Sequence, residues 1–204
     1  MKNYFLATAL FLGAMNGAFP ASSATDADGD GLPDATEPVL GTDPMNADTD
    51  GDGSNDLADK SPLSADNPIP QTGKANALTF TAKVEDNFDA VTKKDVPDHL
   101  ELDVKNTSGK ALKDLSLFYS IKDVKTGKSE AYFKPLTGLV IEKGKSAAVD
   151  VDASGLPGHF RDNPNSSYYT SQNAKTFSIQ LAVPGFAPVT VELKKDAGGA
   201  EQPD

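Results

Sequence analysis

An acidic pattern of twelve residues, which occurs twice with a spacing of 22 residues, constrains the fold of this chain most. The first copy is DADGDGLPDATE, from Asp26 to Glu37, and the second is DTDGDGSNDLAD, from Asp48 to Asp59. Both copies place an acidic residue at positions 1, 3, 5, 9 and 12 and a glycine at position 6. Neighbouring carboxylates repel one another by about 1 kcal/mol per close pair even in water. A segment built this way therefore needs bound cations to become compact.

The pattern is typical of a loop that wraps a calcium ion. Calcium takes about six to eight oxygen ligands, whereas magnesium prefers a rigid octahedron and keeps its water. The sharp turn of such a loop needs the glycine at position 6, and position 7 supplies a backbone carbonyl. We therefore expect about two Ca²⁺ ions. The predicted ligands are Asp26, Asp28, Asp30, the Leu32 carbonyl, Asp34 and Glu37 for one ion, and Asp48, Asp50, Asp52, the Ser54 carbonyl, Asp56 and Asp59 for the other. Asp43 and Asn46 are weaker candidates, better suited to capping turns.

The residues before and between the two loops show which family of calcium-binding module the segment resembles. No helix can precede the first loop, and residues 38–44 (PVLGTDP) allow at most one helical turn before glycine and proline stop it. This excludes paired helix–loop–helix hands and dockerins, which need longer helices. Residues 26–62 instead resemble thrombospondin type 3 repeats of bacterial exported proteins, in the DxDGDGLxDxxE loop, the LGTDP turn and the second DTDGDG. The resemblance implies that the ions are structural and organise a segment with little apolar core.

The two ends of the chain are predicted to lie outside any folded domain. Residues 1–24 have a basic start, a short apolar run and small residues before Ala24, which is typical of a cleaved signal peptide. The expected location is therefore secreted, at the cell surface or in the periplasm, with no membrane span in the mature chain. The remaining chain divides into repeats (residues 25–60), a linker (61–76) rich in proline and polar residues, a domain (77–195) and a flexible tail (196–204).

The domain at residues 77–195 has the alternation of apolar and polar residues that is typical of β-strands. We count seven such stretches, separated by Gly, Pro and Asn turns, and no amphipathic helix. This predicts a mainly β protein, with a seven-stranded antiparallel β-sandwich after the short, irregular calcium-binding segment. The sandwich is expected to be of the immunoglobulin or fibronectin type III kind, and residues 99–123 resemble strands of bacterial sandwich domains related to cell adhesion.

A loop at residues 153–174 is longer than a minimal sandwich needs, and long loops in compact domains are often functional. Its candidate partner-binding residues are His159, Phe160, Arg161, Tyr168 and Tyr169. One hypothesis is that they bind a protein or stack on a glycan, since such residues are common at binding surfaces. The alternative is that the aromatic side chains plug one end of the sandwich.

Composition narrows the possible functions further. The chain has no cysteine and only two histidines, which excludes thiolate chemistry and leaves little scope for imidazole-rich metal sites. The formal charge of −11 argues against nucleic acid as a partner. No catalytic motif is present, and His99 and His159 are each expected to be structural. We therefore expect an exported, non-enzymatic calcium-binding protein whose sandwich is used for adhesion or protein binding, or alternatively a carbohydrate-binding accessory module.

Overall fold

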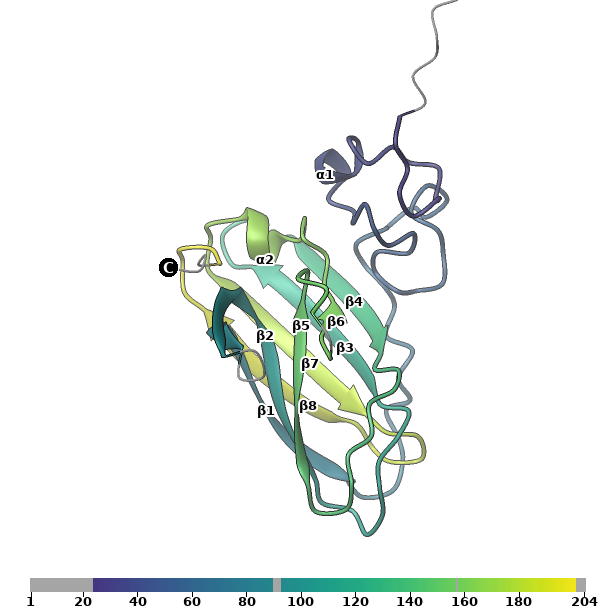
Figure 1. Ribbon diagram of the computed structural model, residues 1–204, viewed down its shortest axis with the longest axis vertical. Helices are drawn as coiled ribbons and strands as arrows, with labels where there is room; N and C mark the ends of the chain where they lie inside the picture. Colours follow the sequence, from purple (N-terminus) through teal and green to yellow (C-terminus); the bar gives the residue numbers. More distant parts are fainter. Residues whose placement is uncertain (1–23, 90–92, 157, 201–204) are drawn as a thin grey trace, which may run out of the picture.

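The computed structural model describes residues 24–89, 93–156 and 158–200, and it is mainly β (Figure 1). The predicted signal peptide, apart from Ala24, lies outside the described residues, as do the last four residues of the predicted tail. The strands form two four-stranded sheets. The first sheet has the order β1 (Leu78–Asp89), β2 (Lys94–Asn106), β5 (Ser146–Asp152), β6 (Phe160–Arg161), and the second has the order β4 (Ser129–Pro135), β3 (Ser116–Asp123), β7 (Lys175–Ala182), β8 (Val189–Lys195).

The prediction of a mainly β fold is confirmed, but the expected count of seven strands is wrong. Each of the seven alternating stretches lies in a strand, and β6 is an eighth, formed within the 153–174 loop. It pairs in parallel with β5, through Val151 with Phe160 and Asp152 with Arg161, so the first sheet is not wholly antiparallel. A strand of two residues has no alternation by which the sequence can reveal it.

The two sheets pack face to face around one apolar core to which both contribute (Figure 1). In β3 the side chains of Leu117, Tyr119 and Ile121 are at most 1% exposed, while the residues between them are partly exposed. In the neighbouring β7, Ile179 lies opposite Tyr119 and is also buried. Burial of a large apolar side chain contributes about 1.5–3 kcal/mol, so the alternation fixes which face of each strand turns inward. We refer to residues 77–195 as the two-sheet domain.

Residues 61–76, which we predicted to be a linker, lie against the outer face of the second sheet. Isolated bridges pair Ser64 with Ala131 and Lys74 with Phe186. Gln180 alternates with the core residues of β7 and therefore faces outward, where its side chain accepts hydrogen bonds from the Asn67 and Gln71 amides at 2.9 and 3.0 Å. The segment thus covers part of the sheet as it passes from the repeats to β1.

Two helices of four residues each complete the described secondary structure: α1 (Glu37–Leu40) and α2 (Ser167–Thr170). Helix α1 is the single turn expected between the acidic loops, and it ends at Gly41, whose φ of +87° and N–H to the Glu37 carbonyl close the turn. In the described part of the chain, no helix has the length and apolar character needed to cross a membrane.

Candidate metal centre

The two acidic loops are held by the same internal hydrogen bonds. In each loop the carboxylate at position 1 accepts hydrogen bonds from the backbone N–H groups of the glycines at positions 4 and 6. These glycines have φ values between +77° and +98°, a conformation that glycine adopts without strain. The bonds run to Asp26 from Gly29 (2.9 Å) and Gly31 (3.2 Å), and to Asp48 from Gly51 (3.0 Å) and Gly53 (2.9 Å).

Carboxylates converge within each loop as the pattern predicts. One oxygen from each of Asp26, Asp28 and Asp30 lies within 4.8 Å of the others, and the same holds for Asp48, Asp50 and Asp52. Asp30 and Asp50 are buried, at 5% and 1% exposed. Burial raises the pKa of Asp50 to about 6, although the hydrogen bonds that its carboxylate accepts from the backbone of Asp52 and Ser64 act to lower it. Each loop therefore concentrates negative charge where solvent screens it poorly.

A third cluster joins the two repeats around Glu37. Carboxylate oxygens of Asp30, Glu37 and Asp56 lie within 4.8 Å of one another, and all three residues are buried. The sequence pattern assigns Asp56 to the second ion, whereas the fold places its carboxylate beside Asp30 and Glu37, two predicted ligands of the first. Burial, together with the negative charges of Asp28 and Asp30, raises the pKa of Glu37 to about 7. The two repeats therefore share a cluster of three buried carboxylates.

Four of the buried carboxylate oxygens in this cluster and the adjoining first loop have no hydrogen-bond partner in the structure. They are Oδ2 of Asp28, Oδ2 of Asp30 and both oxygens of Glu37. A buried ionised carboxylate is strongly unfavourable unless it is paired or bound to a metal. The chemistry of this donor set, all hard oxygen, therefore fits a hard cation such as calcium.

The remaining predicted ligands have more varied surroundings. The Asp34 and Asp56 carboxylates at position 9 accept hydrogen bonds from the N–H at position 2 of their own loops, at 2.8 Å from Ala27 and 2.9 Å from Thr49. Asp59, at position 12 of the second loop, accepts a hydrogen bond from the Ser61 N–H at 2.8 Å. At position 7, the N–H of Leu32 and that of Ser54 each bond the Asp side chain two residues earlier.

The repeat segment is docked onto the two-sheet domain through the 153–174 loop. The Arg161 guanidinium, next to the end of β5, forms a two-pronged ion pair with Asp43, in which Nε and Nη2 each lie 2.5 Å from a carboxylate oxygen. The side-chain amides of Asn163 and Asn165 donate to the carbonyls of Gly41 and Thr42 at 2.7 and 2.6 Å. Asp43 is therefore a docking residue here, and this loop binds another part of its own chain.

A second contact joins the second acidic loop to the edge strand β4. The Phe133 N–H donates to the Asp50 carbonyl at 2.7 Å, and the Ser64 N–H donates to the Asp50 carboxylate at 2.8 Å. Gly51 lies so close to β4 that a Cβ atom on it would stand 2.0 Å from the Phe133 carbonyl oxygen. Gly51 thus serves a close backbone approach as well as a turn. The motif alone shows only the turn.

The aromatic residues of the 153–174 loop point inward. Tyr168 is 1% exposed, packs in the core and donates a hydrogen bond from its hydroxyl to the Val84 carbonyl. Phe160 and Tyr169 are partly buried against the same core, and the Tyr169 hydroxyl lies 3.3 Å from the Asp162 carboxylate. Only 2% of the His159 side chain is exposed. This placement agrees with the plug that we considered as the alternative for these residues, and it leaves the Tyr168 ring without a face to offer a glycan.

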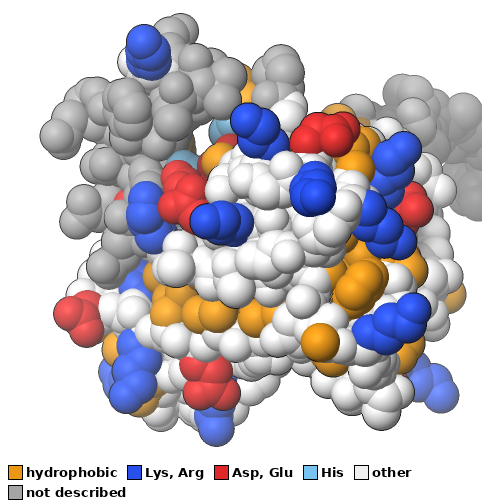
Figure 2. All heavy atoms as spheres, turned by 90° about the horizontal axis from the view of Figure 1, so that it is seen from below, with side chains coloured by type: hydrophobic (Ala, Val, Ile, Leu, Met, Phe, Trp, Pro, Cys, Tyr) orange, Lys and Arg blue, Asp and Glu red, His pale blue; other side chains and the backbone are white. Residues whose placement is uncertain are grey.

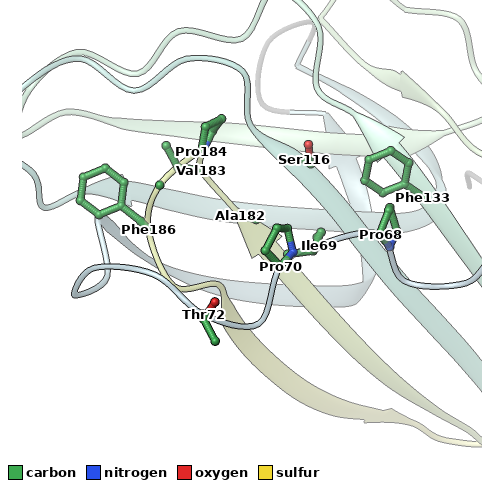
Figure 3. A pocket seen from close by; sticks show the side chains of 11 residues that line it. Pro68, Ile69, Pro70, Thr72, Ser116, Phe133, Ala182, Val183, Pro184 and Phe186 are labelled. Carbon is green, nitrogen blue, oxygen red and sulfur yellow. The ribbon is translucent and has the colours of Figure 1, made fainter.

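An apolar pocket of about 380 Å³ lies between the 61–76 segment and the second sheet (Figure 3). Figure 3 shows Phe186 and Pro184 at one end, Phe133 at the other, and Pro70 and Ile69 between them. None of the side chains lining the pocket is ionisable, so these residues offer no acid–base pair.

Sequence reasoning missed Asn163 and Asn165 as docking residues. Their only signal is that the loop is rich in Asn and Pro, which is equally common in ordinary turns. The chain was also compared with known proteins. No protein-family model matches it. A search of curated proteins gives no match either.

Proposed function

We propose that residues 25–60 bind about two calcium ions and that these ions hold the repeats in their compact, docked arrangement. The observation that carries this is the set of buried carboxylate oxygens of Asp28, Asp30 and Glu37 that have no hydrogen-bond partner. Bound Ca²⁺ supplies the missing positive charge and accepts several oxygen ligands in an irregular geometry. Magnesium suits such a site less well, since it requires a near-ideal octahedron.

In this proposal the calcium is structural. The apolar core lies entirely in residues 77–200, so the repeats have no comparable source of stability. Metal binding then supplies the free energy that folds the segment. The resemblance of residues 26–62 to thrombospondin type 3 repeats supports this role. The predicted signal peptide supports export of the protein. Outside the cytoplasm, calcium is abundant enough to fill sites of modest affinity.

We propose further that the two-sheet domain is a β-sandwich of the immunoglobulin or fibronectin type III kind. Its first sheet contains β1, β2 and β5 in the places of strands A, B and E, and its second contains β3, β7 and β8 in the places of C, F and G. Such domains serve many functions, and many cell-surface proteins contain them. A non-enzymatic role in adhesion or protein binding follows as part of the proposal.

The end of the two-sheet domain remote from the repeats is the surface that best suits a protein partner. Figure 2 looks onto this end, where Lys and Arg side chains, with a smaller number of Asp and Glu side chains among them, are spread around a band of hydrophobic side chains. The exposed lysines at this end are Lys105 near the end of β2, Lys110 and Lys113 between β2 and β3, and Lys143 and Lys145 before β5, and they outnumber the exposed acidic residues of the same two loops, Asp114 and Glu142. This charge is opposite to that of the repeats and favours an acidic protein partner. The burial of Tyr168 and the partial burial of Tyr169 give the carbohydrate alternative less support.

Calorimetric titration of the full chain with Ca²⁺ tests the metal proposal. We expect about two ions per chain at micromolar to millimolar dissociation constants. Because Asp48→Asn with Asp52→Asn disables one loop, this variant should bind about one ion fewer, while the exposed Glu142→Gln serves as a control and binds as the wild type does. A chain that takes up no calcium at millimolar concentration would contradict the proposal.

A pull-down with the calcium-loaded full chain as bait tests the partner surface. The Lys110→Gln, Lys113→Gln and Lys143→Gln triple variant should lose a partner that the wild type retains, and high salt should weaken the wild-type interaction. A partner that the triple variant retains equally well argues against this end of the domain.

A further inference from the structure

The two ends of the molecule carry opposite charge. In residues 26–66, which include the repeats, twelve acidic residues stand against a single basic residue, Lys60. At the remote end of the two-sheet domain, exposed lysines instead outnumber exposed acidic residues. Figure 1 shows α1 at the top of the molecule and the loop between β2 and β3 at the bottom. One molecule can therefore present a basic surface to the acidic segment of another.

Exposed apolar side chains are concentrated on the repeats. Of the six large hydrophobic residues that are exposed in the described part of the chain, four lie there: Val39, Leu40, Met45 and Leu57. Val39 and Leu40 are 85% and 48% exposed and are neighbours in α1, whose first residue, Glu37, is buried. A single exposed apolar residue is normal, but these two adjacent ones form a small apolar projection on an acidic segment. We refer to Val39 and Leu40 as the α1 tip.

The apolar pocket on the second sheet reaches the basic end of the domain. Ser116 and Ala182, which line it, pair at the end of β3 and β7 where the loop from β2 enters the sheet. At the Phe186 end of the pocket (Figure 3), the Lys110 Nζ atom lies 5.9 Å from the centre of the Phe186 ring. Lys74 pairs with Phe186 in an isolated bridge and is exposed. Two lysines thus border an apolar space of about 380 Å³.

We propose that a second copy of this chain inserts its α1 tip into the Phe186 end of this pocket, so that copies associate head to tail. Insertion moves exposed apolar side chains from water into an apolar site, which is favourable in proportion to the area buried. It also brings the acidic repeats next to Lys74 and Lys110, and opposite charges across an interface speed encounter and fix the register. Two different surfaces meet in this heterologous contact, so the copies form a ring or an open filament.

Charge complementarity selects a second copy as the occupant. Self-association rests on the proposed function, because it uses the same basic end of the domain and names the acidic partner that binds there. The repeats stay acidic with two bound Ca²⁺ ions, whose four positive charges are fewer than the net eleven negative charges of residues 26–66. Within one chain, the ion pair of Arg161 with Asp43 docks the repeats near the end of β5, so the α1 tip of the same copy stays away from the Phe186 end.

Sedimentation velocity of the full chain, in excess Ca²⁺ and at low salt, tests this association. We expect the average mass to rise with chain concentration above that of one chain. The first variant, Val39→Ser with Leu40→Ser, removes the α1 tip. The second, Lys74→Glu with Lys110→Glu, reverses the charge beside the pocket. Each variant should weaken association by at least about tenfold, and neither changes a predicted calcium ligand or a docking residue.

A mixture of the two variants gives the sharper result. The first variant keeps an intact pocket and the second keeps an intact α1 tip, so an equimolar mixture should form dimers and nothing larger. The matched control, Val124→Ser with Lys128→Glu, changes exposed residues at the turn between β3 and β4 and should associate as the wild type does.

A calcium-loaded chain that stays monomeric up to about 1 mM overturns head-to-tail association. So does association that both variants retain, or that their mixture does not restore. Calorimetric titration of the same samples with Ca²⁺ separates this failure from that of the metal proposal, because a monomer that takes up about two ions contradicts self-association alone. A monomer that captures a different acidic protein through Lys110 identifies another occupant and equally overturns the second copy.

Discussion

Arg161 and Asp43, which are far apart in the sequence, form a two-pronged ion pair that fastens the repeats to the two-sheet domain. The Asp43 side chain is buried, at 1% exposed, while 36% of the Arg161 side chain remains exposed. The planar fork of arginine matches a carboxylate in a way that lysine does not. The pair therefore fixes the orientation of docking as well as contributing to its strength.

Replacing Arg161 should loosen the repeats without unfolding the two-sheet domain. We expect Arg161→Ala to destabilise docking by about 1–3 kcal/mol, because a buried carboxylate loses its charged donor. Arg161→Lys should retain only part of the docking free energy that Arg161→Ala loses. Hydrogen exchange across residues 25–60 measures the effect, and a double-mutant cycle with Asp43→Asn isolates the pair. The exposed Lys113→Ala is the control. Unchanged exchange in Arg161→Ala would mean that the two asparagine contacts suffice for docking.

Gly51 and Gly29 offer a matched comparison, since both occupy position 4 of their loops with φ of +82° and +77°. A Cβ on Gly29 meets no atom within 4 Å, whereas one on Gly51 collides with the Phe133 carbonyl. Gly29→Ala should therefore show only the backbone strain, about 1–2 kcal/mol. Gly51→Ala should be worse by about 1–3 kcal/mol and should speed amide exchange at Phe133. Thermal unfolding gives the comparison, and equal losses in the two variants would exclude the close approach to β4.

Glu37→Gln should act in opposite directions with and without metal. In chelator, the variant removes one negative charge from a buried acidic cluster, so the repeats should exchange amide protons more slowly than in the wild type. In calcium, the same change removes a charged ligand and should weaken binding by about tenfold, or about 1.4 kcal/mol. Calorimetry and hydrogen exchange measure the two effects. A variant that is destabilised under both conditions would assign Glu37 a packing role only.

The contribution of Asp123 should depend on pH. The backbone N–H of Thr126, the Asn173 amide and the Ser171 hydroxyl hold the pKa of Asp123 well below its usual range. A depressed pKa means that the unfolded state binds a proton more readily than the folded state. The stabilisation is therefore complete above about pH 4 and declines as the pH falls below this value. Asp123→Asn should have a lower melting temperature than the wild type at pH 7. The difference between the two melting temperatures should shrink as the pH falls below about 4.

Much of the fold follows from local patterns in the sequence. Leu117, Tyr119 and Ile121 alternate with polar residues, and period-two alternation translates directly into a strand with one buried face. Strand β6 escapes this reasoning because Phe160 and Arg161 form a strand only where β5 provides a partner. The path of residues 61–76 escapes it too, because proline-rich composition does not show that Asn67 and Gln71 will find Gln180.

In the candidate site, too, some features follow from local sequence spacing and others depend on the tertiary fold. The convergence of Asp26, Asp28 and Asp30 is local, so the spacing of the pattern predicts it. The meeting of Glu37 with Asp56 depends on how one loop folds against the next, which no spacing within a loop contains. The docking of Arg161 on Asp43 is less predictable still, since it depends on the pairing of β5 with β6 and on the path of the loop after β5.

The course of residues 61–76 has a mechanical consequence. Two isolated bridges and a few amide hydrogen bonds hold this segment to the sheet, whereas β1 is clamped along its length by β2. A force applied from the repeat end loads these contacts one after another, once docking fails. We expect the segment to peel away and to release about 50 Å of extended chain. Because β1 is paired with β2 along its length, we expect the strands to stay paired while residues 61–76 peel away.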